Sequence, residues 1–128
     1  MIYIRATAYG EPDASPLVKV YQYSDSGDEL ILEHSAAMVQ EKLGKGMKVN
    51  VNEAMLLYCH HVASAMRAKK VAEAIEKSAK RVLAPEQVMV GVPETLRTIS
   101  LDAIVDGRRA LIRLDELIPS AGYIMTRR

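Results

Sequence analysis

The side chains best suited to nucleophilic or metal chemistry are Cys59, the adjacent pair His60 and His61, and His34. Neighbouring residues of a helix point about 100° apart, so His60 and His61 cannot share one metal ion without distortion. Histidine ligands on one helix are typically four residues apart, and that spacing does not occur here. A thiol also needs a correctly placed base, which a sequence neighbour on a helix does not provide. We therefore interpret Cys59 as a buried structural residue, and the histidine pair as one half-buried and one surface side chain.

The carboxylates and the glycines give no stronger indication of an active site. No pair of carboxylates stands alone on an apolar face, where burial would shift its pKa. The run Gly44–Gly46 lacks the remainder of a phosphate-binding loop. The sequence therefore predicts no catalytic, no cofactor-binding and no metal-ligating residue. The carboxylates considered are Glu29, Glu33, Glu53, Glu73, Glu76, Asp102, Asp115 and Glu116.

Charge and composition disfavour several classes of partner. The chain has 17 Lys and Arg against 16 Asp and Glu, a net charge of +1, and aromatic residues are not interleaved with its basic clusters. Nucleic-acid binding is therefore not expected. The single cysteine argues against a disulfide framework, and no apolar run is long enough to span a bilayer. With no signal-peptide core, we expect a soluble, cytoplasmic protein without a membrane partner.

The first 23 residues predict a β-hairpin. Residues 2–9 alternate between two faces, and residues 17–23 are rich in β-branched and aromatic side chains. A turn-forming segment, residues 10–16, separates these strands. A lone hairpin is marginally stable in water, so we expect it to pack on the domain or on another chain. We also expect the helical domain to stay folded when residues 1–23 are removed.

Three helices are predicted next. The first covers about residues 28–43, with a capping box formed by Ser26 and Glu29, and the second begins at a capping box formed by Asn50 and Glu53. A polar break over residues 67–70 separates it from a third helix at about residues 71–83. The predicted apolar stripes are Leu32, Ala36, Val39 and Leu43, widened by Ile31 and Met38; then Val51, Met55, Tyr58, Val62 and Met66; then Val71, Ala74, Ile75, Ala79 and Val82.

A corner over residues 80–94 precedes the C-terminal strands. Pro85 suits the first turn of a short helix, Gly91 can take a positive φ, and Pro93 is expected to stop further helix. Val88, Met89 and Val92 are expected to form a small apolar face. Alternating runs at 99–105 and 108–114 flank Asp-Gly, a strong hairpin signal.

The predicted fold class is α+β: a small bundle of three to four helices followed by a C-terminal β-hairpin, with an additional N-terminal β-hairpin. The chain divides into the hairpin extension (1–23), the helical domain with its C-terminal hairpin (24–119) and a tail (120–128).

Three segments, at residues 44–58, 81–94 and 99–119, resemble the gamma subunit of urease in the same order along the chain. Such a match in several segments is far more specific than a single short motif. The matched positions are Gly46, Lys48, Asn50, Glu53 and Ala54 in the first segment, Gln87, Val88, Met89, Gly91, Val92, Pro93 and Glu94 in the second, and Ile99, Ala103, Asp106 and Gly107 in the third.

The resemblance implies a helical bundle closed by a β-hairpin. It also implies a non-catalytic subunit of a nickel enzyme that hydrolyses urea, with the nickel in a larger catalytic subunit and no cofactor in this chain. The implied partners are that catalytic subunit, a small beta-type subunit and further copies of this chain, a trimer being favoured.

Two departures accompany the resemblance. The N-terminal hairpin precedes the point where the family begins. The family's Arg-Asp-Gly-Lys break is Arg67-Ala68-Lys69-Lys70 here, and this loss of glycine would allow the helices on either side to be continuous. An alternative function is a stand-alone, self-associating binding or regulatory module that keeps the fold without urease activity. An exposed strand edge in the extension would be a natural pairing site.

Overall fold

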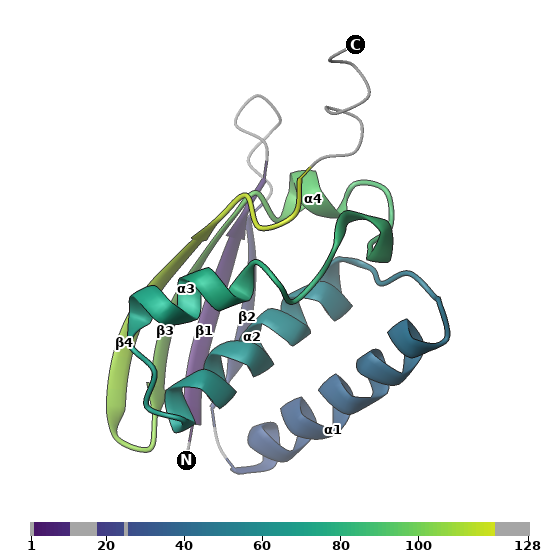
Figure 1. Cartoon of the computed structure of the whole chain (residues 1–128). Coiled ribbons are helices and arrows are strands. Elements are labelled where there is room, and N and C mark those ends of the chain that lie inside the picture. The colour runs from purple at the N-terminus through teal and green to yellow at the C-terminus, as the bar shows by residue number, and fades with distance from the viewer. Residues whose placement is uncertain (1, 11–17, 25, 120–128) are drawn as a thin grey trace.

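The computed structural model describes residues 2–10, 18–24 and 26–119 of the chain. Its sheet and helices form the α+β fold predicted from the sequence (Figure 1). The elements are β1 (Ile2–Tyr9), β2 (Val18–Tyr23), α1 (Ser26–Gly44), α2 (Val51–Arg67), α3 (Ala72–Ala79), the 3-10 helix η1 (Pro85–Gln87), α4 (Val92–Thr95), β3 (Thr98–Val105) and β4 (Arg108–Asp115).

The two predicted hairpins join into one antiparallel sheet with the strand order β2-β1-β3-β4. The N-terminal hairpin thus packs on the domain, and β1 lies in the middle of the sheet between β2 and β3. Its register runs from Ile2 opposite Val105 to Tyr9 opposite Thr98, so every residue of β3 faces a residue of β1. This pairing joins segments from opposite ends of the chain.

The helices cover one face of this sheet. α2 packs against β1 and β3, α3 against β4, and α1 lies outside α2 with its start near β2 (Figure 1). Side chains alternate between the two faces of a strand, so each strand contributes every second residue to the core. The inward rows of the central strands are Ile2, Ile4, Ala6 and Ala8 in β1, and Ile99, Leu101, Ala103 and Val105 in β3.

α1 carries apolar side chains on a buried side and on an exposed side, and the predicted apolar stripe combined residues of both. Leu32, Ala36 and Val39 are buried as predicted. Ile31 and Met38, expected to widen that stripe, are instead 58% and 61% exposed. α1 begins at Ser26, and the predicted capping box of Ser26 with Glu29 rests on a side chain outside the described part of the chain. The Ser24 N–H donates to the Asp28 carboxylate at 3.0 Å.

α2 follows its prediction closely. Asn50 is its N-cap, and the capping box with Glu53 is present. Met55, Tyr58, Val62 and Met66 are buried and Val51 is partly buried. The helix ends at Arg67 and does not continue into α3.

The break after α2 depends on the backbone of Lys69. Lys69 has φ 60, and its N–H donates to the Met66 carbonyl oxygen at 2.9 Å. The Lys70 N–H then donates to the Ala65 carbonyl oxygen at 3.0 Å. A left-handed residue at this place ends a helix and satisfies its last carbonyl groups. Lys69 therefore performs a task for which glycine is better suited.

α3 is shorter than predicted, and its inward face is narrower. It ends at Ala79, and Val71 and Ala74, expected to point inward, are exposed. Ile75 and Ala79 are buried and Val82 is partly buried.

In the corner over residues 80–94, the expectation for Pro93 is wrong. Pro93 does not stop a helix, because it lies in the first turn of α4, where its missing N–H costs no hydrogen bond. Gly91 is the N-cap of that helix, and its φ of 92 confirms the predicted positive φ. Val88 and Val92 are buried, whereas Met89 is exposed. Pro85 begins η1, as expected.

The C-terminal hairpin matches its sequence signal. Asp106 and Gly107 have φ 50 and 82, the left-handed pair that a tight two-residue turn requires. The predicted tail, residues 120–128, lies outside the described residues.

Candidate interaction surface

Cys59 does not have the environment of a nucleophile. It lies on the buried face of α2 and has no exposed surface. Burial raises the pKa of its thiol to about 12, so the thiol stays protonated at neutral pH. The interpretation as a buried cysteine is therefore confirmed.

His61 is held by a hydroxyl group on the neighbouring helix. Its Nε2 lies 2.7 Å from the Ser78 hydroxyl oxygen, and that hydroxyl donates to the Ile75 carbonyl oxygen at 3.1 Å. Because the Ser78 proton is committed to Ile75, Nε2 is the donor to Ser78. Burial lowers the pKa of His61, as does the nearby His60, although the Ile75 backbone opposes the shift. A neutral imidazole bridging α2 and α3 follows at neutral pH.

The other two histidines do not join His61 in a ligand set. The Nε2 of His60 lies 3.8 Å from the Glu33 carboxylate on α1, and His34 is on the exposed side of α1. A cavity of about 570 Å³ is lined by His60, His61 and Arg81 together with the Ser64 and Ser78 hydroxyl groups, among others. Within residues 2–10, 18–24 and 26–119, no group of three or more His, Cys, Asp or Glu is placed to hold a metal ion.

Two segments singled out in the sequence meet side by side. The Val49 N–H donates to the Gln87 carbonyl oxygen at 3.0 Å, and the Met89 N–H donates to the Val49 carbonyl oxygen at 2.9 Å. These bonds form a parallel bridge between Val49 and Val88, whose side chains are both buried. The segments 46–54 and 87–94 thereby form one surface, which we call the bridged surface.

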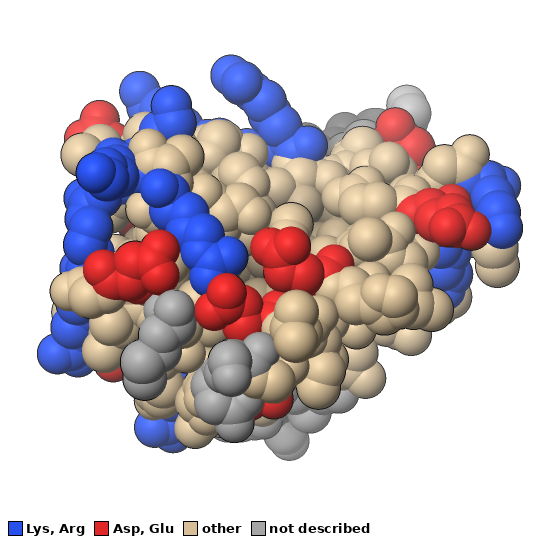
Figure 2. All heavy atoms as spheres, turned by 90° about the horizontal axis from the view of Figure 1, so that it is seen from below, with Lys and Arg blue, Asp and Glu red and all other residues tan. Residues whose placement is uncertain are grey.

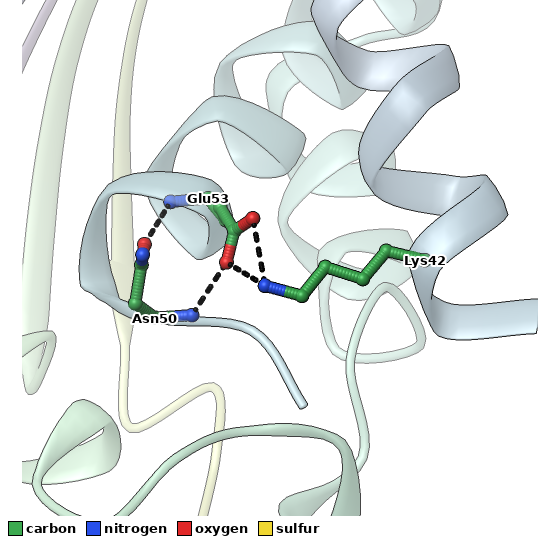
Figure 3. Close-up of polar contacts among 3 residues, drawn as sticks. All are labelled: Lys42, Asn50 and Glu53. Atoms are coloured by element: carbon green, nitrogen blue, oxygen red, sulfur yellow. Dashed lines mark hydrogen bonds and ion pairs between the residues drawn. The ribbon is translucent and has the colours of Figure 1, made fainter. Parts of the chain in front are cut away.

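The start of α2 is fixed by a network at the edge of this surface (Figure 3). Asn50 accepts from the Glu53 N–H at 2.8 Å, and the Asn50 N–H donates to a Glu53 carboxylate oxygen at 2.9 Å. Lys42, in the last turn of α1, donates to both oxygens of the same carboxylate at 2.9 and 3.0 Å. The capping box of Asn50 and Glu53 was predicted from their spacing in the sequence. The contact with Lys42 was not predicted, because no local sequence pattern indicates it.

The bridged surface carries apolar side chains that the fold leaves in solvent. Met47 and Met89 are about half exposed, and Val90 is fully exposed. A groove of about 580 Å³ lies beside Met47 and is lined in part by Met38, Met47 and the Lys42–Glu53 pair. Exposed apolar groups that gather with charged neighbours are typical of protein–protein contact sites.

Arg67 connects three elements at the opposite end of α2. Its guanidinium group pairs with Glu29 on α1, lies 3.8 Å from the Glu33 carboxylate, and lies 3.7 Å from Asp106 in the β3–β4 turn. Figure 2 shows acidic and basic side chains intermixed on the face of the molecule that is seen from below. No field of one sign results there, so this end offers no general attraction for a polyanion.

A model of the family "Urease, gamma subunit" matches residues 22–118. The chain belongs to this family. It is 33% identical over 92 residues to a urease subunit gamma of Halalkalibacterium halodurans, a match covering 71% of this chain and 91% of that one. It is 29% identical over 91 residues to the urease subunit gamma of Saccharopolyspora erythraea, with the same two coverages.

A longer relative also matches. The chain is 26% identical over 99 residues to a protein named urease subunit alpha from Helicobacter pylori, a match covering 77% of this chain and 42% of that one. The chain thus spans less than half of that relative. All of β1 and most of β2 precede the residues matched by the urease gamma family model.

Nickel, which urease family membership implies for the enzyme, does not fit the described side chains of this chain. The Cys59 thiol is buried and protonated, and the Nε2–H of His61 is directed at Ser78. His60 and His34 lie on different helices, and the described residues provide no third ligand beside them. We therefore derive no chemical step through a metal in this chain.

Proposed function

We propose that the chain is a non-catalytic structural subunit of a urease-type nickel enzyme that hydrolyses urea in the cytoplasm. The observation that carries this proposal is the family match over residues 22–118, together with the meeting of two of its sequence motifs at the bridged surface. The nickel ions would belong to the larger catalytic chain.

The proposed contribution of this subunit is to bury apolar surface against its partners. Val90 and Met89 would contact a neighbouring chain from one side of the bridge, and Met47 from the other. Burial of such side chains favours association because it removes apolar surface from water. The backbone that presents them is fixed by Gly91, with φ 92, and by the Val49–Val88 bridge. Family membership also supports a small beta-type partner and a trimeric arrangement of copies.

The experiment is purification of a tagged copy from its native host, followed by mass spectrometry of the proteins that accompany it. We expect a large metallohydrolase chain and a small β-rich chain. Recovery of the tagged chain without any metallohydrolase chain, from cells that express one, would overturn the proposal. Urea hydrolysis by this chain alone with added nickel would also overturn it.

Two variants locate the contact. Val90→Asp changes a fully exposed side chain, so we expect the melt to be unchanged while recovery of the catalytic chain falls. The matched control is Leu111→Asp, which places the same charge at an exposed position on β4, away from the bridged surface. Equal recovery with both variants would contradict the assignment of this surface.

A second candidate function is a self-associating binding or regulatory module that does not act with a urease. The feature favouring it is the hairpin that for the most part precedes the family match, whose strand β2 forms one edge of the sheet. An edge strand can pair with another chain. Recovery of the tagged chain with only copies of itself would support this candidate.

A further inference from the structure

We propose that the edge of β3 is a strand-binding site, which this chain fills with its own residues 2–9. The ligand class is an extended peptide, antiparallel to β3, with apolar residues at alternate positions. This inference rests on the sheet and on the extent of the family match. It does not depend on a role in urea hydrolysis.

The first argument is how completely β1 occupies this place. Eight residues of β1 face eight residues of β3 without a bulge, from Ile2 opposite Val105 to Tyr9 opposite Thr98. The inward side chains of β1 have almost no exposed surface, and Ile4 lies between the sheet and the helical layer. Without β1, the β3 edge would lose its backbone partners and the apolar core would open beside it.

The second argument is that the family match does not include this strand. The match begins at residue 22, whereas β1 ends at Tyr9. The matched part covers 91% of the two gamma relatives, which leaves less than a tenth of their length for anything further. Chains of that size have little length left to build a covering hairpin. In such chains, an edge equivalent to β3 would have to be covered by something other than an N-terminal hairpin of this length.

The third argument concerns the other side of the C-terminal hairpin. The outer edge of β4 is not equally open, because α3 packs beside it and the Glu76 carboxylate lies 3.5 Å from the Arg113 N–H. An acidic side chain at an edge N–H opposes pairing with a further strand. Of the two edges of the β3–β4 hairpin, that of β3 is therefore the one suited to strand addition.

The inward and outward rows of β1 define what the site accepts. The inward row has branched residues at Ile2 and Ile4 and small ones at Ala6 and Ala8, all buried. The outward row is largely polar, and Arg5 faces Asp102 across the pair. Main-chain hydrogen bonds provide affinity in such strand addition, and alternate side chains provide specificity. A foreign strand can enter only by displacing β1, so the hairpin restricts which partners the sheet accepts.

The test uses the full chain with a site for a specific protease inserted between residues 10 and 18. After cleavage, we expect both fragments to elute together in native buffer. The cut protein is then unfolded in guanidinium chloride and refolded with an excess of a labelled peptide spanning residues 1–10. We expect label in the folded fraction in proportion to that excess.

Two altered peptides make the test specific. A peptide with Ile4→Asp should be incorporated about a hundredfold less well, because it would bury an unpaired charge. A peptide with Thr7→Asp carries the same charge on the outward row and should be incorporated almost as well as the unaltered peptide.

Three outcomes would overturn the proposal. They are equal incorporation of the Ile4→Asp peptide, absence of any incorporation, and release of β1 from the cut chain with an unchanged melt. A refolded dimer in which each uncut copy supplies its strand to the other would overturn the assignment to residues of the same chain. None of these results depends on nickel or on a urease partner.

Discussion

Lys42 and Glu53 join the end of α1 to the start of α2 through two hydrogen bonds of 2.9 and 3.0 Å to one carboxylate. The same carboxylate accepts the Asn50 N–H and so completes the capping box. One side chain therefore both caps the beginning of α2 and ties it to the last turn of α1. Because this corner adjoins the groove beside Met47, the pair also shapes the bridged surface.

Substitutions at Glu53 separate its two tasks. Glu53→Ala removes the acceptor for the Asn50 N–H and the partner of Lys42, and we expect it to lower the free energy of unfolding by about 1–2 kcal/mol. Glu53→Gln keeps an acceptor oxygen but loses the charge, so its cost should stay below about 1 kcal/mol. Chemical denaturation at neutral pH measures both values. An equal cost for the two variants would show that only the charge matters.

The same pair predicts a pH dependence. Partial burial acts to raise the pKa of Glu53, but hydrogen bonds from the Asn50 backbone and the Lys42 ammonium group outweigh it, and the pKa lies below its usual 4.5. A lowered pKa means that the carboxylate stabilises the fold above the unfolded value and loses this effect as pH falls through the folded value. The stability difference between the wild type and Glu53→Gln should be constant above pH 4.5 and shrink below it. A difference that persists in acid would refute this.

Lys69→Gly should stabilise the protein. Lys69 has φ 60, a conformation that costs an ordinary L-residue about 1–2 kcal/mol and costs glycine almost nothing. Glycine also costs more conformational entropy on folding, and after this cost is subtracted we expect the free energy of unfolding to rise by about 1 kcal/mol. Lys70→Gly is the control, since among the described residues the positive φ values do not include Lys70, and it should give no gain. Thermal melts of the two variants distinguish them.

β1 should be essential for the fold. Ile4 has no exposed surface, and Ile4→Ala should cost about 2–5 kcal/mol because it leaves a cavity between sheet and helices. Arg5→Ala changes the exposed face of the same strand and should alter the free energy of unfolding by no more than about 0.5 kcal/mol.

The structure also leads us to expect that removal of residues 1–23 abolishes the cooperative melt, unlike the expectation from sequence. A truncated chain that melts like the whole one would favour the original division at residue 23.

Tyr58→Phe should not destabilise the protein, and we expect it to raise the free energy of unfolding by as much as about 1 kcal/mol. The Tyr58 hydroxyl is buried and has no hydrogen-bond partner among the described residues. Burying such a group unsatisfied costs about 1–3 kcal/mol, and phenylalanine fills the same space without it. The matched control is Tyr21→Phe, which removes a hydroxyl that donates to the Asn52 side chain and should not stabilise the fold. Guanidinium denaturation of both variants measures the difference, and a destabilised Tyr58→Phe would indicate a partner outside the described residues.

The features found correctly from sequence are those with a local chemical cause. The Asn50–Glu53 box and the Asp106–Gly107 turn each depend on residues within three positions of one another. The alternation of residues 2–9 likewise predicted β1 with its boundaries.

The features missed depend on distant partners. Periodicity could not tell which apolar side of α1 faces α2, so Ile31 and Met38 were assigned to the wrong side. The pairing of β1 with β3 has no local signal, because each hairpin is self-consistent without the other. The candidate surface was missed for the same reason, since the Val49–Val88 bridge joins segments about 40 positions apart. Sequence similarity identified both segments, but only the fold places them side by side.

The pairing of β1 with β3 has a consequence for biosynthesis. Ile2 is translated long before its partner Val105, so the centre of the sheet stays incomplete until most of the polypeptide has left the ribosome. Contacts between residues so distant in sequence slow folding, because a long loop must close before they form. During that interval the early hairpin has an unfilled edge that attracts other strands. The time needed to translate the helices therefore sets how long that edge stays without its partner strand.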